Sequence, residues 1–325
     1  MRTDLRTRSL VLDAAGIPLS ALVAEPEDRA PKAVLLAVHG RGMRAAYFAG
    51  PAHPDTSLLT LAADLGYTVL AVDRPGHGAS AHRLPAGQLI ADQAATLHAA
   101  LTDYARAHDT GAGVQLLAHS FGGKIALQLA AHWPDNPRLP LLGCDISGLA
   151  QHYAPGAWDR PDDLAGGGRL NWGPLNLYPP GTFHAARTLL TPVPALESRE
   201  LATWPARYSA LAARVRVPVR LTLAEHEHWW RLDEASRTAL TAAFPTGLAH
   251  LVTAHGAGHN LSLGHAARPY HLRALAFTDD CLTRPATAAP AAAAPAAAAP
   301  AAAAPAAAAP AAGAAAVPAP ALATV

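Results

Sequence analysis

The sequence predicts an α/β protein with a mostly parallel central sheet and helices on both of its faces. Three observations lead to this fold class. Short runs of consecutive apolar residues recur along the chain, segments with helical spacing of apolar residues separate them, and several runs end in loops rich in Gly and His. Parallel strands need long crossover connections, which helices supply. Reactive side chains should then lie at the carboxyl ends of the strands.

Two short antiparallel strands are predicted at an edge of the sheet. Residues 10–12 and 17–23 are strand-like and lie on either side of Gly16, which favours a tight turn. Residues 33–38 follow as a continuous apolar run, which is typical of a central strand buried on both faces.

The first strand–helix–strand unit comes next. A helix over residues 58–65 can begin at Thr56 or Ser57, because both are good N-cap residues, and it can end at Gly66. The apolar run at 67–72 then predicts the following strand.

A second unit repeats this pattern. Apolar residues at alternating steps of four and three between Ile90 and Tyr104 mark one face of a helix, and residues 114–118 return to a strand. Strand and helix patterns then alternate as far as Phe277.

A break in this alternation indicates a cap inserted after the sixth strand. About seventy residues separate the strand at 141–146 from the strand at 217–223, which is long for a loop without structure of its own. We therefore divide the chain into a core, residues 1–147 and 215–284, and a cap, residues 148–214. Aromatic residues of the cap should divide between packing and pocket lining: Trp158, Trp172, Tyr178, Phe183, Trp204 and Tyr208.

The end of the chain has a different composition. From Pro285 onward it is almost entirely Ala and Pro, with a Pro at every fifth position from 290 to 310. Pro removes a backbone donor and clashes with the preceding helical turn, so a continuous helix cannot form. We predict a disordered, semi-stiff spacer over residues 285–325, and a tether to a partner is the functional alternative.

Composition argues against several classes of partner. The formal net charge is +1 at pH 7 with acidic and basic residues interspersed, which predicts no nucleic-acid or membrane partner. Cys144 and Cys281 are too few for a disulfide framework, and no apolar run reaches the length of a membrane span. Because the amino terminus also lacks signal-peptide features, we expect a cytoplasmic protein. The sequence leaves the oligomeric state open.

A serine lies between a strand and a helix at residues 118–123, Ala-His-Ser-Phe-Gly-Gly. This segment resembles the nucleophile elbow of the α/β-hydrolase family, in which a sharp turn presents the serine in a strained backbone conformation. The resemblance implies that Ser120 is the nucleophile. Gly122 supplies one of the small residues that the turn needs, and Ala118 replaces the family's usual first glycine. The alternative is that Ser120 only caps the helix.

The family's chain order of nucleophile, acid and histidine requires a histidine after the last strand. His259 lies in the Gly-rich loop 256–260, after the strand-like residues 251–253. The resemblance implies that His259 is the general base, a role for which imidazole is suited near neutral pH. His255 is the alternative.

Glu227 is the leading candidate for the acid. It follows the strand at 217–223, where the family commonly has a Gly-x-x-Asp turn, and it would accept the second imidazole N–H and stabilise the imidazolium. Asp145, at the end of the preceding strand, is the alternative acid, and Glu225 is a close neighbour that could replace Glu227.

The resemblance also implies two backbone donors for the oxyanion that forms during acyl transfer. Phe121 N–H is the first. Arg41 N–H, in the loop 39–42, is our choice for the second, with Gly40 N–H as the alternative, and His39 is expected to brace this loop. Residues expected to contact the substrate are Gly40, His119, Trp172, Tyr178, His228 and Trp229.

The resemblance to the α/β-hydrolase family covers about residues 8–282. Together these expectations predict a serine hydrolase that cleaves a carboxylic ester or thioester of a mid-sized apolar substrate. His226 and His228 flank Glu227, but alternate residues of an extended segment point to opposite sides, so we predict no metal site and no organic cofactor. Acyl transfer, cyclisation, lyase chemistry and a binding protein with a vestigial triad are the alternatives.

Overall fold

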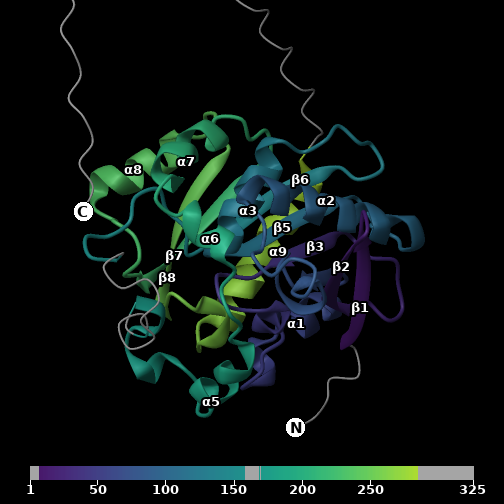
Figure 1. Cartoon of the computed structure of the whole chain (residues 1–325), viewed down its shortest axis with the longest axis horizontal. Helices are drawn as coiled ribbons and strands as arrows, with labels where there is room; N and C mark the ends of the chain where they lie inside the picture. The colour runs from purple at the N-terminus through teal and green to yellow at the C-terminus, as the bar shows by residue number, and fades with distance from the viewer. Residues whose placement is uncertain (1–6, 158–167, 169, 285–325) are drawn as a thin grey trace, which may run out of the picture. The chain divides into compact units, whose positions relative to one another are not determined.

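One eight-stranded sheet organises the residues that the structure describes (Figure 1). The computed structural model describes residues 7–157, 168 and 170–284, so the predicted spacer at 285–325 lies outside the described residues. The strands are β1 (Thr7–Ala14), β2 (Ile17–Ala24), β3 (Val34–Val38), β4 (Thr68–Val72), β5 (Val114–His119), β6 (Leu141–Ser147), β7 (Val219–His226) and β8 (Ala249–Gly258).

The strand order is β1-β2-β4-β3-β5-β6-β7-β8. Strands β3 to β8 run parallel, whereas β2 is antiparallel to both β1 and β4. Ala15 and Gly16 form the β1–β2 turn with φ values of 53° and 89°, and positive φ at both central residues is typical of a two-residue hairpin. The predicted fold class and the predicted edge hairpin are confirmed.

Helices cover both faces of this sheet. They are α1 (Leu58–Asp64), α2 (Ile90–Ala107), α3 (Phe121–Ala131), α5 (Thr182–Ala186), α6 (Ala195–Arg199), α7 (Trp204–Ala212), α8 (Glu234–Ala242) and α9 (Ala267–Thr283). Short 3-10 helices are η1 (Ala45–Phe48), η2 (Pro54–Thr56), η3 (Gly78–Ser80), η4 (Leu175–Leu177), η5 (Arg187–Leu189) and η6 (Leu261–Leu263).

The central strand β3 shows why its sequence is apolar throughout. Val34, Leu36 and Val38 belong to the hydrophobic cluster that includes α2 and α3. Leu35 and Ala37 belong to the cluster on the other face, with α1 and α9. Because successive side chains of a strand point to opposite faces, a strand covered on both sides needs an unbroken apolar run.

The last two strands are longer than their apolar runs predict. Strand β7 continues to His226 and β8 continues to Gly258, and these two residues pair after a shift in register. Glu227 and His259 therefore follow directly from paired positions on neighbouring strands. This extension brings the predicted acid and the predicted base to the same edge of the sheet.

The segment between β6 and β7 contains α5, α6 and α7 and lies in the same compact unit as the sheet. Helix α7 packs on α3, and Trp204 and Tyr208 are buried in the main hydrophobic cluster. These two aromatic residues therefore serve packing, whereas Trp158 lies outside the described residues. The boundaries of the predicted cap remain a prediction.

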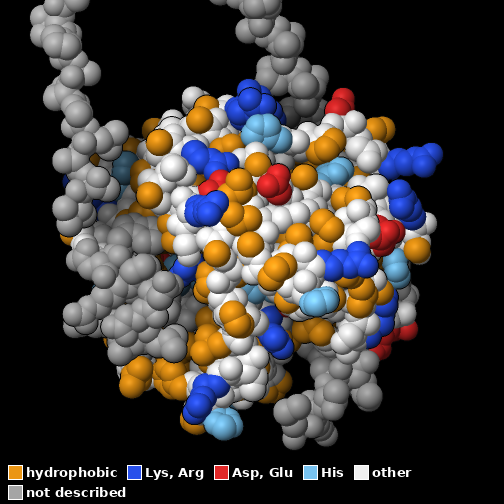
Figure 2. All heavy atoms as spheres, in the orientation of Figure 1, with side chains coloured by type: hydrophobic (Ala, Val, Ile, Leu, Met, Phe, Trp, Pro, Cys, Tyr) orange, Lys and Arg blue, Asp and Glu red, His pale blue; other side chains and the backbone are white. Residues whose placement is uncertain are grey.

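The face seen in Figure 2 mixes basic, acidic and apolar side chains. No helix in the described part of the chain is both long enough and apolar enough to cross a membrane. Cys144 and Cys281 are buried free thiols. Burial raises the pKa of Cys281 to about 12 and raises that of Cys144 further, so both thiols are protonated near neutral pH.

Candidate active site

Ser120 occupies a sharp turn between β5 and α3. Its backbone has φ 53° and ψ −118°, a conformation that few residues other than glycine adopt. The Ser120 N–H donates to the carbonyl of Ser147 at 2.8 Å, which ties the turn to β6. Gly122 lets the helix pass close to β3, because a Cβ there would lie 2.3 Å from the carbonyl oxygen of Val38.

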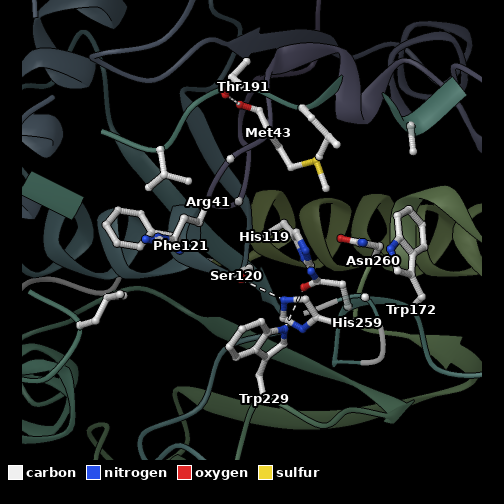
Figure 3. Close-up of a pocket in the computed structure, with 18 of the residues that line it drawn as sticks. Arg41, Met43, His119, Ser120, Phe121, Trp172, Thr191, Trp229, His259 and Asn260 are labelled. Carbon is white, nitrogen blue, oxygen red and sulfur yellow. Dashed lines mark hydrogen bonds between the residues drawn. The ribbon is translucent and has the colours of Figure 1, made fainter. Parts of the chain in front are cut away.

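A chain of hydrogen bonds joins Ser120, His259 and Glu227, and Figure 3 shows Ser120 and His259 from this chain. Ser120 Oγ lies 2.9 Å from His259 Nε2, and His259 Nδ1 lies 2.8 Å from Glu227 Oε2. The other carboxylate oxygen of Glu227 accepts the N–H of Trp229 at 3.1 Å, which fixes the carboxylate plane. The structure thus brings the three residues together, while their catalytic roles remain a prediction.

The alternative acids and the alternative base lie elsewhere. Asp145 is fully buried and accepts from Arg220 Nε at 2.5 Å and from the Tyr270 hydroxyl at 3.3 Å. Glu225 is exposed, accepts the Gly256 N–H at 2.7 Å, and faces His255 across 3.7 Å. The structure does not bring Asp145, Glu225 or His255 to Ser120.

Phe121 and the loop after β3 lie beside Ser120 and line the same pocket (Figure 3). Phe121 begins α3, so its N–H is one of the helix N–H groups without an intrahelical acceptor. Gly40 packs directly on the serine, because a Cβ at Gly40 would lie 3.2 Å from the Cβ of Ser120. The backbone of Gly40 is therefore close to Ser120, and the roles of the Gly40, Arg41 and Phe121 N–H groups as oxyanion donors remain a prediction.

A buried arginine holds this loop in place. Arg74 donates from Nε to the carbonyl of His39 at 3.0 Å and from Nη2 to the carbonyl of Gly40 at 3.1 Å. The Arg74 backbone N–H also donates to His39 Nε2 at 3.0 Å. His39 is therefore a brace, as expected, and burial lowers its pKa well below the usual range, so its ring is neutral.

The partner of Arg74 comes from the segment between β6 and β7. Glu197 on α6 accepts from Arg74 Nη1 at 2.5 Å and Nη2 at 3.2 Å, and its Oε1 also lies 3.3 Å from His77 Nε2. Burial opposes ionisation, but the Arg74 guanidinium and His77 lower the pKa of Glu197 to about 2. Because this pKa is lower in the folded protein, the pair contributes full stability above the ordinary Glu pKa, and the contribution is lost as the pH falls toward 2.

His119 lies under the catalytic histidine candidate. Its ring stacks on Tyr47 with centroids 4.8 Å apart and lies 4.8 Å from the ring of His259. Burial lowers the pKa of His119 well below its usual range, so the ring that lies against His259 is neutral. Gly148 leaves room for both rings, because a Cβ there would lie 2.8 Å from His259 Cε1. The sequence pattern carried no signal for the role of Gly148.

Ser120 lies in the wall of a pocket of about 450 Å³. Among the residues predicted to contact substrate, Gly40, His119, Trp172 and Trp229 line it. Phe183, Leu190 and Val193, which lie between β6 and β7, add apolar surface.

Two residues predicted to contact substrate are not among the residues that line this pocket. Tyr178 is buried and donates its hydroxyl to the carbonyl of Trp172 at 2.9 Å, and His228 is exposed on the surface. Across the described residues, no group of three or more His, Cys, Asp or Glu side chains has a geometry that could hold a metal ion. The expectation of a metal-free site remains a prediction.

Comparison with known proteins agrees with this fold. The family model described as serine aminopeptidase, S33, matches residues 29–144. No curated protein shows significant sequence similarity to the chain. The family-model match covers the first part of the chain, and the solved structures below share the α/β-hydrolase fold with it.

Solved structures share the fold at low identity. A 2-hydroxy-6-oxo-6-phenylhexa-2,4-dienoate hydrolase from Rhodococcus sp. strain RHA1 matches with a TM-score of 0.61 and 17% identity, over 83% of this chain and 99% of that chain. A putative lipase from Acinetobacter baumannii AYE matches with a TM-score of 0.58 and 15% identity, over 85% and 93%. A thermophilic esterase from Thermogutta terrifontis matches with a TM-score of 0.54 and 16% identity, over 85% and 99%.

Proposed function

We propose that the protein is a serine hydrolase that cleaves a carboxylic ester or thioester of a mid-sized apolar substrate through an acyl-enzyme on Ser120. The observation that carries the proposal is the hydrogen-bond chain from Ser120 through His259 to the buried carboxylate of Glu227. This arrangement of hydroxyl, imidazole and acid is the one that activates a serine for attack on a carbonyl.

In the first half of the reaction, Ser120 Oγ attacks the carbonyl carbon while its proton moves to His259 Nε2. The carbonyl oxygen becomes an oxyanion, which accepts from Phe121 N–H and from Arg41 or Gly40 N–H. Glu227 holds the Nδ1–H tautomer and stabilises the imidazolium. The tetrahedral intermediate then collapses, and the alcohol or thiol leaves with the proton from His259.

In the second half, water replaces the leaving group. His259 Nε2 takes a proton from this water, whose oxygen attacks the acyl carbon. The same backbone donors stabilise the second oxyanion. Collapse returns the proton to Ser120 Oγ and releases the carboxylic acid.

Labelling with a serine-directed fluorophosphonate tests the nucleophile. We expect the full chain to be labelled, phenylmethylsulfonyl fluoride to compete, and Ser120→Ala to abolish the label, because only an activated serine reacts rapidly with such probes. Ser209→Ala, an exposed serine on α7, is the matched control and should be labelled like the wild type. Labelling that persists in Ser120→Ala would overturn the proposal.

The apolar side of the pocket leads to a prediction on acyl length. Trp172, Phe183 and Trp229 give a pocket that should favour a medium-length or ring-bearing acyl group over acetyl. The kcat/KM values for a series of p-nitrophenyl and thioester acyl chains measure this preference. A maximum at acetyl would contradict it.

A further inference from the structure

Lys124 is a buried amine close to the serine. The chain contains two lysines, Lys32 and Lys124, against 23 arginines. Lys32 is exposed and pairs with Asp279 at 2.9 Å, as surface lysines commonly do. Lys124 is 2% exposed and lies on α3 one helical turn after Ser120, about 6 Å along the helix axis. It lines the pocket that Ser120 opens into.

The surroundings of Lys124 are aromatic. Its Nζ donates to the hydroxyl of Tyr153. Four rings have their centroids between 5.1 and 5.7 Å from Nζ, those of Phe121, Tyr153, Trp204 and Trp230. Aromatic faces attract a cation and do not accept its protons as a carboxylate does. Within the described residues, no Asp or Glu forms an ion pair with Lys124.

Two acids, Glu197 and Glu200, act on the charge of Lys124 from a distance, but both are paired with other groups of the protein. Glu197 is bound by Arg74 and His77, and Glu200 is bound by Arg207 and by the backbone N–H of residue 90. Both carboxylates are therefore already paired with groups of the protein.

The pocket is positive as well as apolar. Arg41 and Arg187 line it together with Lys124, and none of the described lining residues is acidic. Burial, followed by the charge of Arg41, lowers the pKa of Lys124 well below its usual range. A ligand anion at Nζ would offset this desolvation and favour the ammonium form.

We propose that Lys124 binds a carboxylate of the substrate, so that the preferred ester carries an anionic group about one helical turn from the carbonyl attacked by Ser120. This specificity rests on the proposed hydrolase function. The ammonium of Lys124 donates to the carboxylate, and the apolar walls contact the chain between the two groups. The carboxylate can belong to the acyl group, as in a dicarboxylic acid monoester, or to the alcohol.

Two matched pairs of esters test the proposal and identify the source of the anion. The acyl pair is p-nitrophenyl hydrogen glutarate and p-nitrophenyl pentanoate, and the leaving-group pair is 4-carboxyphenyl pentanoate and phenyl pentanoate. In Lys124→Met, we expect the ratio of kcat/KM for the anionic over the neutral ester to fall at least about tenfold in one pair, because a buried charge partner is lost. Lys32→Met is the matched control and should leave both ratios unchanged. Unchanged ratios in both pairs for Lys124→Met would overturn the proposal.

A binding measurement separates this inference from the hydrolase proposal. In Ser120→Ala, we expect glutarate monomethyl ester to change the tryptophan fluorescence, since Trp229 and Trp230 line the pocket, and we expect binding at least about tenfold weaker in Ser120→Ala/Lys124→Met. Equal binding to both variants contradicts the role of Lys124, whatever the hydrolysis assays give. Absent ester hydrolysis with Lys124-dependent binding contradicts the hydrolase function alone. Lys124→Met keeps a side chain of similar shape and removes a buried amine, so we expect this variant to fold. Melting curves measure whether it does.

Discussion

Replacing Glu227 by Gln is expected to lower kcat by three to four orders of magnitude, about 10³ to 10⁴. The Glu227 carboxylate lies 2.8 Å from His259 Nδ1, where a negative charge stabilises the imidazolium that forms as Ser120 attacks. A glutamine at this position has no charge, and its amide can present N–H groups to Nδ1, which favours the tautomer that cannot accept the serine proton. Saturating turnover of a p-nitrophenyl ester measures the loss.

Two other acids provide matched controls for this result. Glu225→Gln changes an exposed carboxylate two residues away and should leave kcat within about threefold of the wild type. Asp145→Asn should lower the melting temperature, because Arg220 then lies nearly buried beside a neutral amide, but the folded variant should keep its kcat. A large loss of kcat in Asp145→Asn together with an active Glu227→Gln would assign the acid to Asp145.

Arg74→Met is expected to reduce the free energy of unfolding by about 3–5 kcal/mol and to lower kcat as well. Arg74 is fully buried, and its removal leaves the Glu197 carboxylate without its main partner. It also removes the hydrogen bonds to the carbonyls of His39 and Gly40, so the loop beside Ser120 loses its brace. Urea unfolding measures the first effect, and turnover of the folded variant measures the second.

A double variant separates stability from catalysis at this pair. Arg74→Met/Glu197→Leu removes both buried charges, so it should recover much of the lost stability. Turnover should stay low, because the loop still lacks the bonds that Arg74 donated. Full recovery of kcat in the double variant would show that Arg74 has no part in positioning the loop 39–42 beside Ser120.

The fold could be predicted closely where burial alone determines the residue pattern. The unbroken apolar run at 33–38 indicates β3, because a strand covered on both faces is apolar throughout. The apolar steps of three and four from Ile90 to Tyr104 indicate α2, because that helix buries one face. Strand β8 could not be bounded in this way. Its second half contains His255 and Gly256, and hydrogen bonding to β7, which no local pattern specifies, extends it to Gly258.

The candidate site shows the same division. The order of Ser120, Glu227 and His259 along the chain indicated which side chains meet, because each follows the carboxyl end of a strand. The sequence did not indicate that Arg74 and Lys124 belong to the site, because arginine and lysine side chains usually lie on the surface. Only the tertiary structure shows that each is buried among specific partners. The apolar neighbours of Lys124 on α3 were the available signal.

The bond between Arg74 and Glu197 limits how this protein could be re-engineered. Exchanging the segment between β6 and β7 for that of another protein would change the apolar pocket wall to which Phe183, Leu190 and Val193 contribute. Here α6 in that segment supplies the carboxylate that holds the arginine behind Gly40. A chimera that lacks an acid at the place of Glu197 should therefore lose rate even on small substrates that never touch the exchanged segment.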